Sequence, residues 1–398
     1  MSISNTLAII LAASEENGLQ PLTDHRTRSA VPFGGSYRII DFALTNCLRS
    51  GLRRVLVLSQ FKSLPLYKHL RDAWSIFNPE LGEYITHVPP QMLDGRNGYA
   101  GSADAIYQNL YLLRRNTDEH VFVLSGAHIY RMDYAAMLEQ HVQTKADATL
   151  ACIPMEHPGA DPRLQGLHCD KQGCIEAFEP AGDKPATVSM ELAVLRKSVL
   201  IQALEEDAAN GESGHDLGHD VLPALLAGHK LMAYEFGRAT GRVTPDRYWR
   251  KLTSLDVYYE ANMDLLRSDP PLDLYQADWP VRSRPTQKPP ARTVPGRSCN
   301  EGVCVNSMIA GGVVIAGGGV NHSILFSGVH VDDAAIVEEA ILLNGVQVGE
   351  GSQLRRCIVD KHVHIPPGEQ IGFDPEADAH RFTLTEKGIV VVPASYCF

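Results

Sequence analysis

The chain has 398 residues, of which 44% are hydrophobic and 21% charged, and its formal net charge is −11. This length suits two domains, and the composition is that of a globular protein with a sizeable core, whereas a general nucleic-acid-binding protein would need a basic face. The longest apolar runs, such as Leu7–Ala13, are too short to cross a membrane, and no basic stretch precedes this run as in a secretory signal.

Short apolar segments alternate with helical segments through the first part of the chain. Strands are predicted at Thr6–Ala13, Arg53–Gln60, His120–Gly126 and Asp147–Met155, and helices at Arg38–Gly51, Leu64–Trp74, Ala103–Arg115 and Met132–Thr144. This alternation predicts an α/β domain with a mostly parallel sheet and helices on both faces. Ligands of such sheets bind beyond the carboxyl ends of the strands, so Ala13–Gly18, Gln60 and Ala127 are expected to face one cleft.

The second part of the chain has a different organisation. After about Ser268 the sequence becomes rich in proline and polar residues, which is typical of an extended linker. Beyond it, similar units begin at Ser307, Ser323, Ala340 and Cys357, at offsets of 16, 17 and 17. A fixed period of short strands and turns predicts a solenoid, here a left-handed parallel β-helix, rather than a β-sandwich with chance similarity. The predicted domains are 1–268 and 301–398, joined by the linker 269–300.

The eight cysteines do not include a C-x-x-C pair. A zinc site would require tighter clustering with histidine. We therefore expect reduced thiols and a cytoplasmic protein.

Several stretches together resemble ADP-glucose pyrophosphorylase, the glucose-1-phosphate adenylyltransferase of bacterial glycogen and plant starch synthesis. They are "PLTDHRTRSAVPFGGSYRIIDFALTNCLRSGLRRVLVLSQFKS", "GYAGSADAIYQN", "LSGAHIYRMDY", "HDLGHDVLP", "YYEANMDLL", "DLYQADWPV" and "IGFDPEADAHRF". The resemblance covers nearly the whole chain. It implies a Rossmann-like nucleotidyltransferase domain followed by a left-handed β-helix, assembled as a tetramer. The implied reaction joins ATP and glucose 1-phosphate to give ADP-glucose and pyrophosphate, with magnesium.

The two aspartates that hold magnesium in the family are replaced in this chain. Ala127 stands in the G-D-H motif, and Lys251 stands in the W-R-D-V-G-T motif, whose glycine is replaced by Thr253. Magnesium requires oxygen ligands, and its charge stabilises the transition state of nucleotidyl transfer. We therefore predict no metal and no other cofactor for this chain. Rescue carboxylates, if any, would be Glu15, Glu16 and Asp104, although their spacing does not show that they converge.

The nucleotide loop is altered as well. The family pattern G-G-x-G-x-R-L reads Ala13 to Leu19 here, with Glu16 at its third glycine and Gly18 at its arginine. Two adjacent carboxylates, Glu15 and Glu16, would repel a triphosphate. Remnants of the nucleotide pocket that match the family are Gln60, Gly101, Ser102, Ala103 and Asp104.

The resemblance also indicates a sugar-phosphate side. Matching residues there are Tyr99, Gly166, Glu179 and Ser189. Glu191 replaces the glycine of S-M-G, and no lysine follows Glu179 in the family register. Arginines that could bind an anionic effector are Arg28, Arg53, Arg54, Arg355, Arg356 and Arg381, although a solvated surface charge is the simpler interpretation for any one of them.

Scaffold segments match the family, whereas most phosphate- and metal-handling positions do not. The first hypothesis is a catalytically inactive or very weak homologue that regulates an active subunit in a hetero-oligomer, with a homotetramer as the other assembly. The second is an active adenylyltransferase with altered metal ligands. The third is a module that senses sugar nucleotides or sugar phosphates. Expected ligands are ATP, ADP-glucose or phosphorylated sugars, and neither nucleic acid nor membrane is an expected partner.

Overall fold

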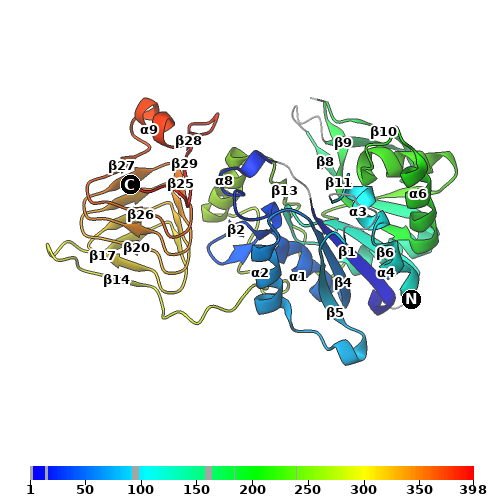
Figure 1. Cartoon of the computed structure of the whole chain (residues 1–398), viewed down its shortest axis with the longest axis horizontal. Coiled ribbons are helices and arrows are strands. Elements are labelled where there is room, and N and C mark those ends of the chain that lie inside the picture. Colours follow the sequence, from blue (N-terminus) through cyan, green and yellow to red (C-terminus); the bar gives the residue numbers. More distant parts are fainter. Residues whose placement is uncertain (1–2, 14–16, 92–97, 157–163, 183, 239) are drawn as a thin grey trace. The chain divides into compact units, whose positions relative to one another are not determined.

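The computed structural model describes residues 3–13, 17–91, 98–156, 164–182, 184–238 and 240–398 (Figure 1). It divides into two compact units, each built from segments far apart in the sequence. Unit 1 comprises Met1–Glu15, Phe42–Trp249 and Gln276–Val281, and unit 2 comprises Glu16–Asp41, Arg250–Tyr275 and Arg282–Phe398. The boundaries 1–268, 269–300 and 301–398 follow the linear sequence and stay a prediction.

Unit 1 is built on a nine-stranded sheet. Its strands are β1 (Thr6–Ala12), β4 (Arg54–Ser59), β5 (Tyr84–Val88), β6 (His120–Ser125), β8 (Ala148–Met155), β9 (Gln165–Cys169), β10 (Ile175–Pro180), β11 (Ala186–Arg196) and β12 (Leu231–Glu235). Strands β6, β1, β4 and β5 lie side by side in parallel, which confirms the predicted parallel core. The long strand β11 joins this core in antiparallel pairing to β6 and β8, an addition that the alternating pattern did not indicate.

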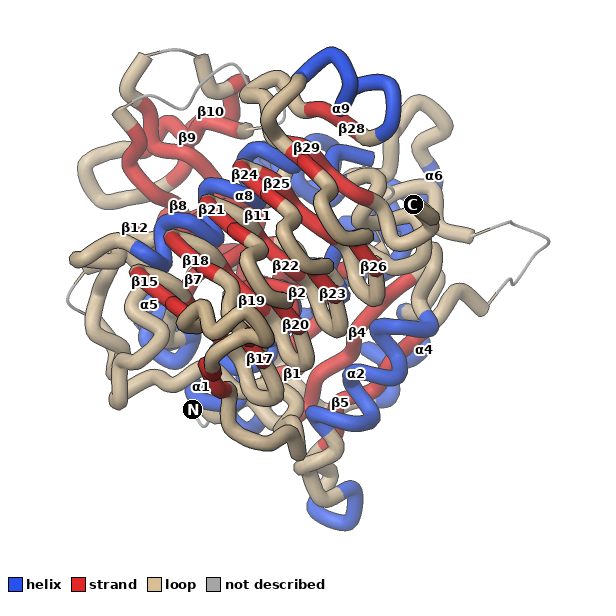
Figure 2. The backbone as a smooth tube through the Cα atoms, turned by 90° about the vertical axis from the view of Figure 1, so that its left-hand side faces the viewer, coloured by secondary structure: helices blue, strands red, loops and turns tan. Residues whose placement is uncertain are grey.

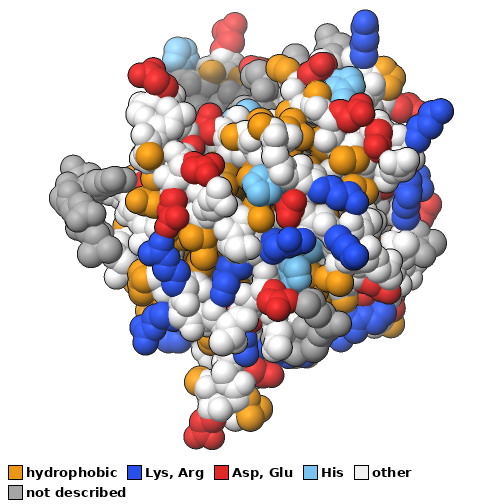
Figure 3. All heavy atoms as spheres, turned by 90° about the vertical axis from the view of Figure 1, so that its right-hand side faces the viewer, with side chains coloured by type: hydrophobic (Ala, Val, Ile, Leu, Met, Phe, Trp, Pro, Cys, Tyr) orange, Lys and Arg blue, Asp and Glu red, His pale blue; other side chains and the backbone are white. Residues whose placement is uncertain are grey.

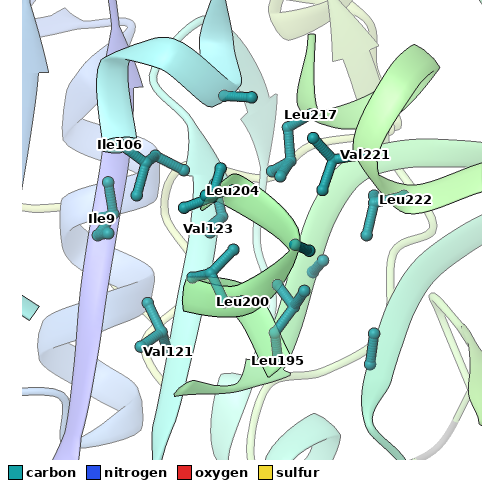
Figure 4. Close-up of a cluster of buried hydrophobic side chains, with 14 of the residues drawn as sticks. Ile9, Ile106, Val121, Val123, Leu195, Leu200, Leu204, Leu217, Val221 and Leu222 are labelled. Atoms are coloured by element: carbon teal, nitrogen blue, oxygen red, sulfur yellow. The ribbon is translucent and has the colours of Figure 1, made fainter. Parts of the chain in front are cut away.

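Helices cover both faces of this sheet. They are α1 (Ile40–Ser50), α2 (Leu64–Trp74), α3 (Ser102–Tyr107), α4 (Leu110–Arg115), α5 (Tyr134–Thr144), α6 (Lys197–Ala209) and the short α7 (Leu222–Ala224). Alternate residues of β1 and β6, such as Ile9, Val121 and Val123, pack with α3, α4 and α6 (Figure 4). On the other face Phe122 lies 5.3 Å from the ring of Tyr134 on α5. The apolar runs are therefore buried from both sides, as expected for central parallel strands.

The predicted helix Ala103–Arg115 is wrong in its middle, because the structure has two short helices there. Asn109 donates its side-chain amide to the Ala105 carbonyl at 2.9 Å, and Gln108 donates to the Asp104 carboxylate at 2.8 Å. Side chains that bond to nearby backbone or to a neighbouring turn compete with a continuous helix. The break lies beside the predicted nucleotide pocket.

The C-terminal part of unit 2 is a parallel β-helix (Figure 2). Its three sheets have the orders β14-β17-β20-β23-β26, β15-β18-β21-β24-β27 and β16-β19-β22-β25-β29-β28. The strands are β14 (Arg292–Val294), β15 (Val303–Val305), β16 (Met308–Ile309), β17 (Val314–Ala316), β18 (Gly319–Asn321), β19 (Ile324–Leu325), β20 (His330–Val331), β21 (Ile336–Glu338), β22 (Ile341–Leu342), β23 (Gln347–Val348), β24 (Gln353–Arg355), β25 (Cys357–Val359), β26 (His364–Ile365), β27 (Gln370–Ile371), β28 (Thr383–Leu384) and β29 (Val390–Val392). A helix α9 (Pro375–Arg381) precedes β28.

The strand register confirms the predicted repeat. Met308 pairs with Ile324, Ile324 with Ile341, and Ile341 with Ile358, which are steps of 16, 17 and 17 residues. Aliphatic residues of successive coils form one buried cluster inside the solenoid. Each coil therefore buries its apolar side chains against the next, as in repeat proteins generally.

The corners of the coils also follow this period. Asn306, His322, Glu339 and Arg356 have φ between 45° and 48° and are again 16, 17 and 17 residues apart. A left-handed backbone at this point turns the chain from one sheet to the next. Non-glycine residues adopt it at a cost that the packed solenoid must outweigh.

Two further segments complete unit 2. The first contains β2 (Pro32–Phe33) and β3 (Tyr37–Arg38), and the second contains α8 (Leu255–Met263). The buried guanidinium of Arg26 lies 2.6 Å from both carboxylate oxygens of Asp360 on the β-helix. Such a bidentate pair fixes both position and orientation. The N-terminal segment 17–41 is thus tied to the solenoid by charge as well as by packing.

The proline-rich segment is not the fully extended linker that its composition predicts. Leu272 is fully buried, and the Trp279 indole is buried and donates to Asn46 Oδ1 at 3.0 Å. Strand β14 already belongs to the first sheet of the β-helix, upstream of the predicted boundary at residue 301. Leu272 and Trp279 are enough to anchor this otherwise polar segment. The average composition of the segment does not reveal two single apolar residues. Within the described residues, no helix is both long enough and apolar enough to span a bilayer.

Candidate functional site

The carboxyl ends of β1, β4 and β6 lie at one edge of the unit 1 sheet. The three strands are parallel and in register to their last residues. Ala13, Gln60 and Ala127 therefore leave the sheet at the same edge, which is where α/β sheets bind ligands. Residues 14–16, including Glu15 and Glu16 of the predicted nucleotide loop, lie outside the described residues.

Ala127 follows β6 directly and is 7% exposed. Its amide donates to the Ser125 hydroxyl at 3.3 Å, which holds the turn after the strand. A methyl group cannot ligate a hard cation. Lys251, the second replaced position, is the last residue of β13 (Trp249–Lys251) and belongs to unit 2.

The described residues do not fit a magnesium site. Among them there is no cluster of three or more histidine, cysteine, aspartate or glutamate side chains able to hold a metal ion. Asp104, the one suggested rescue carboxylate that is described, is 4% exposed. It accepts hydrogen bonds from the Ala100 amide and the Gln108 side chain, each at 2.8 Å. Asp104 therefore holds its own loop together rather than facing a ligand.

The side chains of Trp249, His128 and Glu191 form a chain of close polar contacts, which the sequence alone did not reveal; His128 is the residue after Ala127. Trp249 Nε1 donates to Nδ1 of His128, on β7 (His128–Tyr130), at 3.4 Å. Since Nδ1 accepts this bond, a neutral His128 carries its proton on Nε2. Nε2 in turn lies 3.4 Å from Glu191 Oε2. The Glu191 carboxylate, which the sequence places at a family glycine, therefore lies beside His128.

Glu191 reaches this position through an unusual backbone conformation. It has a φ of 54°, in the left-handed region that favours glycine. It lies in an irregularity of the β11–β8 pairing between Ser189 and Ala193. Its amide donates to the Ser189 hydroxyl at 3.2 Å, so Ser189 serves this bulge. The glycine that the resemblance places here would adopt the same turn without a carboxylate.

Gln60 and Tyr99, both assigned to the ligand site from sequence, contact each other. Gln60 Oε1 accepts from the Tyr99 amide at 2.6 Å, and Gln60 Nε2 donates to the Tyr99 carbonyl at 3.5 Å. The Tyr99 hydroxyl accepts from Asn109 at 3.1 Å. Burial raises the pKa of Tyr99, so its phenol stays protonated at neutral pH.

The loop Gly101–Asp104 docks on a second predicted motif, "HDLGHD". Ser102 Oγ donates to the Asp216 carboxylate at 2.9 Å and accepts from the Leu217 amide at 2.7 Å. Ala103 donates its amide to the His215 carbonyl at 2.8 Å. A Cβ on Gly101 would lie 2.2 Å from the same carbonyl oxygen, so only glycine fits there. The structure thus brings two motifs together that are about a hundred residues apart.

Gly166 and Glu179 are cross-strand neighbours on β9 and β10. The Glu179 carboxylate lies 3.0 Å from His168 Nε2, and both side chains are exposed. A pair this exposed contributes little to stability. Glu179 is therefore accessible, with no cation of a lysine or arginine described beside it.

Gly18, at the arginine position of the nucleotide loop, has no room for a side chain because backbone atoms of Thr253 lie against it. Gly18 belongs to unit 2, as does Thr253, the residue at the altered glycine of the second metal motif. A Cβ on Gly18 would lie 1.7 Å from the Thr253 carbonyl oxygen. The loss of the family arginine is therefore built into the path of the chain and is not a simple change of side chain.

The six candidate effector arginines do not share one environment. Arg53 and Arg54 lie in unit 1 at the amino end of β4, where Arg54 pairs with Asp118 at 2.7 Å and Arg53 donates to the Leu48 carbonyl at 2.9 Å. They are thus at the sheet edge opposite to Gln60. A role of these two arginines in binding an anionic effector stays a prediction, and both already have structural partners.

The remaining four arginines belong to unit 2. Arg28 is buried and donates to the Leu252 carbonyl at 3.2 Å, and Arg356 forms a β-helix corner. Arg381 pairs with Glu369 at 2.8 Å and stacks on aromatic rings near the C-terminus, which leaves Arg355 exposed at the end of β24. Most of these guanidinium groups already have structural partners.

Comparison with known proteins matches two parts of the chain to two families. Residues 7–268 match the nucleotidyl transferase family, and residues 289–392 match the GlmU-like C-terminal hexapeptide family. The hexapeptide match and the three parallel sheets together identify the solenoid as a left-handed β-helix.

Curated relatives match over the full length. The chain is 54% identical to glucose-1-phosphate adenylyltransferase 2 of Vibrio parahaemolyticus, with 100% of both chains covered. It is 50% identical to the protein of the same name from Vibrio cholerae, covering 100% of this chain and 99% of the relative. It is 40% identical to glucose-1-phosphate adenylyltransferase of Methylococcus capsulatus, covering 97% of this chain and 93% of the relative. The chain therefore belongs to the glucose-1-phosphate adenylyltransferase family.

Proposed function

We propose that this chain has little or no adenylyltransferase activity by itself and acts as a regulatory or structural subunit with an active homologue. The reaction of that homologue would join ATP and glucose 1-phosphate to give ADP-glucose and pyrophosphate. The observation that carries the proposal is the methyl side chain of Ala127 at the carboxyl end of β6. This is the position from which the family motif would present a magnesium-binding carboxylate.

The electrostatics of the described edge support the proposal. Nucleotidyl transfer gathers negative charge on the phosphates, and a catalyst must meet it with cations. Here the edge presents the Glu191 carboxylate, whose Oε2 lies 3.4 Å from His128 Nε2. A phosphate at about 4 Å from Glu191 would be repelled by roughly 1–4 kcal/mol, depending on screening.

The condition of the scaffold argues for a retained role. The β-helix core is continuous, and the corner residues keep their period through every coil described. The buried Arg26–Asp360 pair ties the N-terminal segment to this solenoid. A folded solenoid with an altered transfer site suits a protein that works by assembly. A cytoplasmic setting is part of the proposal, since all eight cysteines are free thiols.

Turnover by the purified chain is the first test. With ATP, glucose 1-phosphate and magnesium, we expect a rate at least about a thousandfold below that of an active family member, which corresponds to about 4 kcal/mol of transition-state stabilisation. A rate near the ordinary value of about 10 s⁻¹ would overturn the proposal and favour an active enzyme with altered ligands.

Co-expression with an active homologue is the second test. We expect a mixed oligomer whose response to phosphorylated effectors differs from that of the homologue alone. If no mixed oligomer forms while the chain still binds ATP or ADP-glucose in equilibrium dialysis, the sensing module is favoured instead.

Restoring the metal ligands provides a matched variant. Ala127→Asp combined with Lys251→Asp returns both carboxylates, yet Gly18 still abuts Thr253 and Glu191 still lies beside His128. We expect the double variant to remain at least about a hundredfold below an active enzyme. High activity from these two changes alone would show that the metal ligands were the only defect.

A further inference from the structure

A cavity of about 610 Å³ lies in unit 1, away from the carboxyl edge of the sheet. It is lined by three segments: residues 117–120 before and at the start of β6, residues 141–146 at the end of α5, and residues 196–198 at the start of α6. His120 begins β6, whereas Ala127 follows its end. At 3.3 Å per residue, the strand separates the two places by about 20 Å.

The cavity has a basic lining although the chain as a whole is acidic. Lys145, Arg196 and Lys197 line it, and the carboxylates in the lining are Asp118 and Glu119. On the face of unit 1 drawn in Figure 3, basic and acidic side chains are interspersed. Three cations against two carboxylates leave a positive balance.

Neighbouring ion pairs keep this balance unchanged. Asp118 pairs with Arg54 at 2.7 Å, and Arg196 lies 3.4 Å from Asp147. Arg54 and Asp147 are outside the lining and have opposite charges, so including them leaves the net charge around the cavity the same. Lys197 Nζ donates to the Asn116 carbonyl at 2.5 Å and is thereby held at the rim. Lys145 is exposed, and its ammonium group has no ion-pair partner among the described residues.

Two histidine rings form one wall and have unsatisfied nitrogens. The His141 ring is completely buried; its Nδ1 bonds to Thr149 Oγ1 at 2.8 Å, and its Nε2 has no hydrogen-bond partner in the described part of the chain. His120 Nδ1 is also buried without a hydrogen-bond partner in the described part of the chain. The two imidazole rings meet edge to face, with their centroids 5.0 Å apart. Both nitrogens are inaccessible to solvent, so they lie behind the surface of the cavity, and the features that favour a ligand are the shape and the cations of the lining.

The amino end of α6 faces the same space. The helix has 13 residues, and its N-cap residue Arg196 makes no side-chain capping bond. The Lys197 amide is satisfied by the Glu119 carbonyl at 2.8 Å. The positive end of the helix dipole adds to the lysine and arginine charges and favours an anion.

We propose that this basic cavity is a binding site for a small molecule that carries a phosphate group. The phosphate would lie between Lys145, Arg196 and the amino end of α6, with the organic part against the partly exposed His120. The volume falls in the range of about 300–1,000 Å³ that is usual for small-molecule sites. The site is independent of turnover, and its ligand would not compete with a ligand at the carboxyl edge.

Equilibrium dialysis of the full chain with radiolabelled inorganic phosphate tests the site. We expect saturable binding, weakened about tenfold or more by Lys145→Asn with Arg196→Gln. Asparagine suits position 145, because the Lys145 φ is 53°.

A matched control removes two positive charges elsewhere in unit 1. Lys68 on α2 and Lys171 in a surface turn are exposed, so Lys68→Gln with Lys171→Gln should bind phosphate as the parent chain does. Absence of saturable binding, or equal affinity in the cavity variant and the parent chain, would overturn the proposal. Equal loss in both double variants would show a general charge effect and would also overturn it. None of these results depends on adenylyltransferase activity.

Discussion

Gly18→Ala is predicted to destabilise unit 2 strongly, although alanine is only one methyl larger. The added Cβ would lie 1.7 Å from the Thr253 carbonyl oxygen and 2.8 Å from its carbonyl carbon. Both atoms are backbone, so relief requires a shift of the chain and not of a flexible side chain. Overpacking costs about 1–3 kcal/mol, and we expect the upper end here.

Differential scanning calorimetry of the full chain measures this cost. About 3 kcal/mol corresponds to a lower unfolding temperature by about 6–12 °C for a unit of this size. Gly211→Ala is the matched control, because no atom lies within 4 Å of its added Cβ. If Gly18→Ala unfolds at the same temperature as Gly211→Ala, the close approach of Gly18 to Thr253 does not exist and the loop is free to change.

The same contact sets an expectation for the family arginine. Gly18→Arg supplies the missing cation, yet its Cβ meets the Thr253 carbonyl first. We expect no gain in ATP affinity from this change alone, and a loss of stability at least as large as that of alanine. A tighter ATP complex with unchanged stability would refute the reasoning.

Three further predictions concern charged groups. Glu191→Gly removes the carboxylate beside His128 and relieves a left-handed backbone, so equilibrium dialysis should show roughly tenfold tighter binding of glucose 1-phosphate; an unchanged dissociation constant would contradict this. Burial, followed by the charge of neighbouring His120, lowers the pKa of His141 to about 4. The unfolded chain, with a pKa of about 6.5, therefore binds the proton first as the pH falls, and up to about 3 kcal/mol of stability is lost between about pH 6.5 and pH 4. Thermal unfolding of His141→Asn should lack this loss, whereas a change at the exposed His364 should retain it. Arg26→Leu leaves Asp360 buried without its cation and should lower the free energy of unfolding by about 3–5 kcal/mol, measured by calorimetry. The double variant Arg26→Leu with Asp360→Asn should regain part of this loss. Equal stability of the single and double variants would argue against an ion pair between the two residues.

The regular parts of the fold could be predicted from the sequence because they repeat simple periods. The β-helix repeat of 16 and 17 residues appears directly in the strand register. The parallel core followed from its apolar runs. The break between α3 and α4 could not be predicted in this way, because it depends on the side-chain bonds of Gln108 and Asn109 to particular neighbours.

The sequence predicted which residues lie at the carboxyl edge of the sheet, but it did not predict which of the site residues contact one another. Ala127 and Gln60 lie at the expected edge, because parallel strands align their ends. The chain from Trp249 through His128 to Glu191 joins residues up to about 120 positions apart and has no local signal. A glutamate at a family glycine was the one available hint, since a left-handed φ at that position must be held by surrounding contacts.

The alterations of the transfer site are coupled by the backbone, and this coupling bears on how they arose and on what they permit. Once Thr253 approaches Gly18, an arginine at position 18 has no room, and once Glu191 lies beside His128, a phosphate in that place meets a negative charge. Each change therefore makes the return of another group less favourable, so single reversions are not expected to add up. Within unit 1, the basic cavity at the amino end of β6 is separated from Ala127, beyond the other end of that strand, by the length of the strand. The altered carboxyl edge and the basic cavity lie at opposite ends of β6, so the proposed loss of activity and the proposed phosphate site can be tested independently.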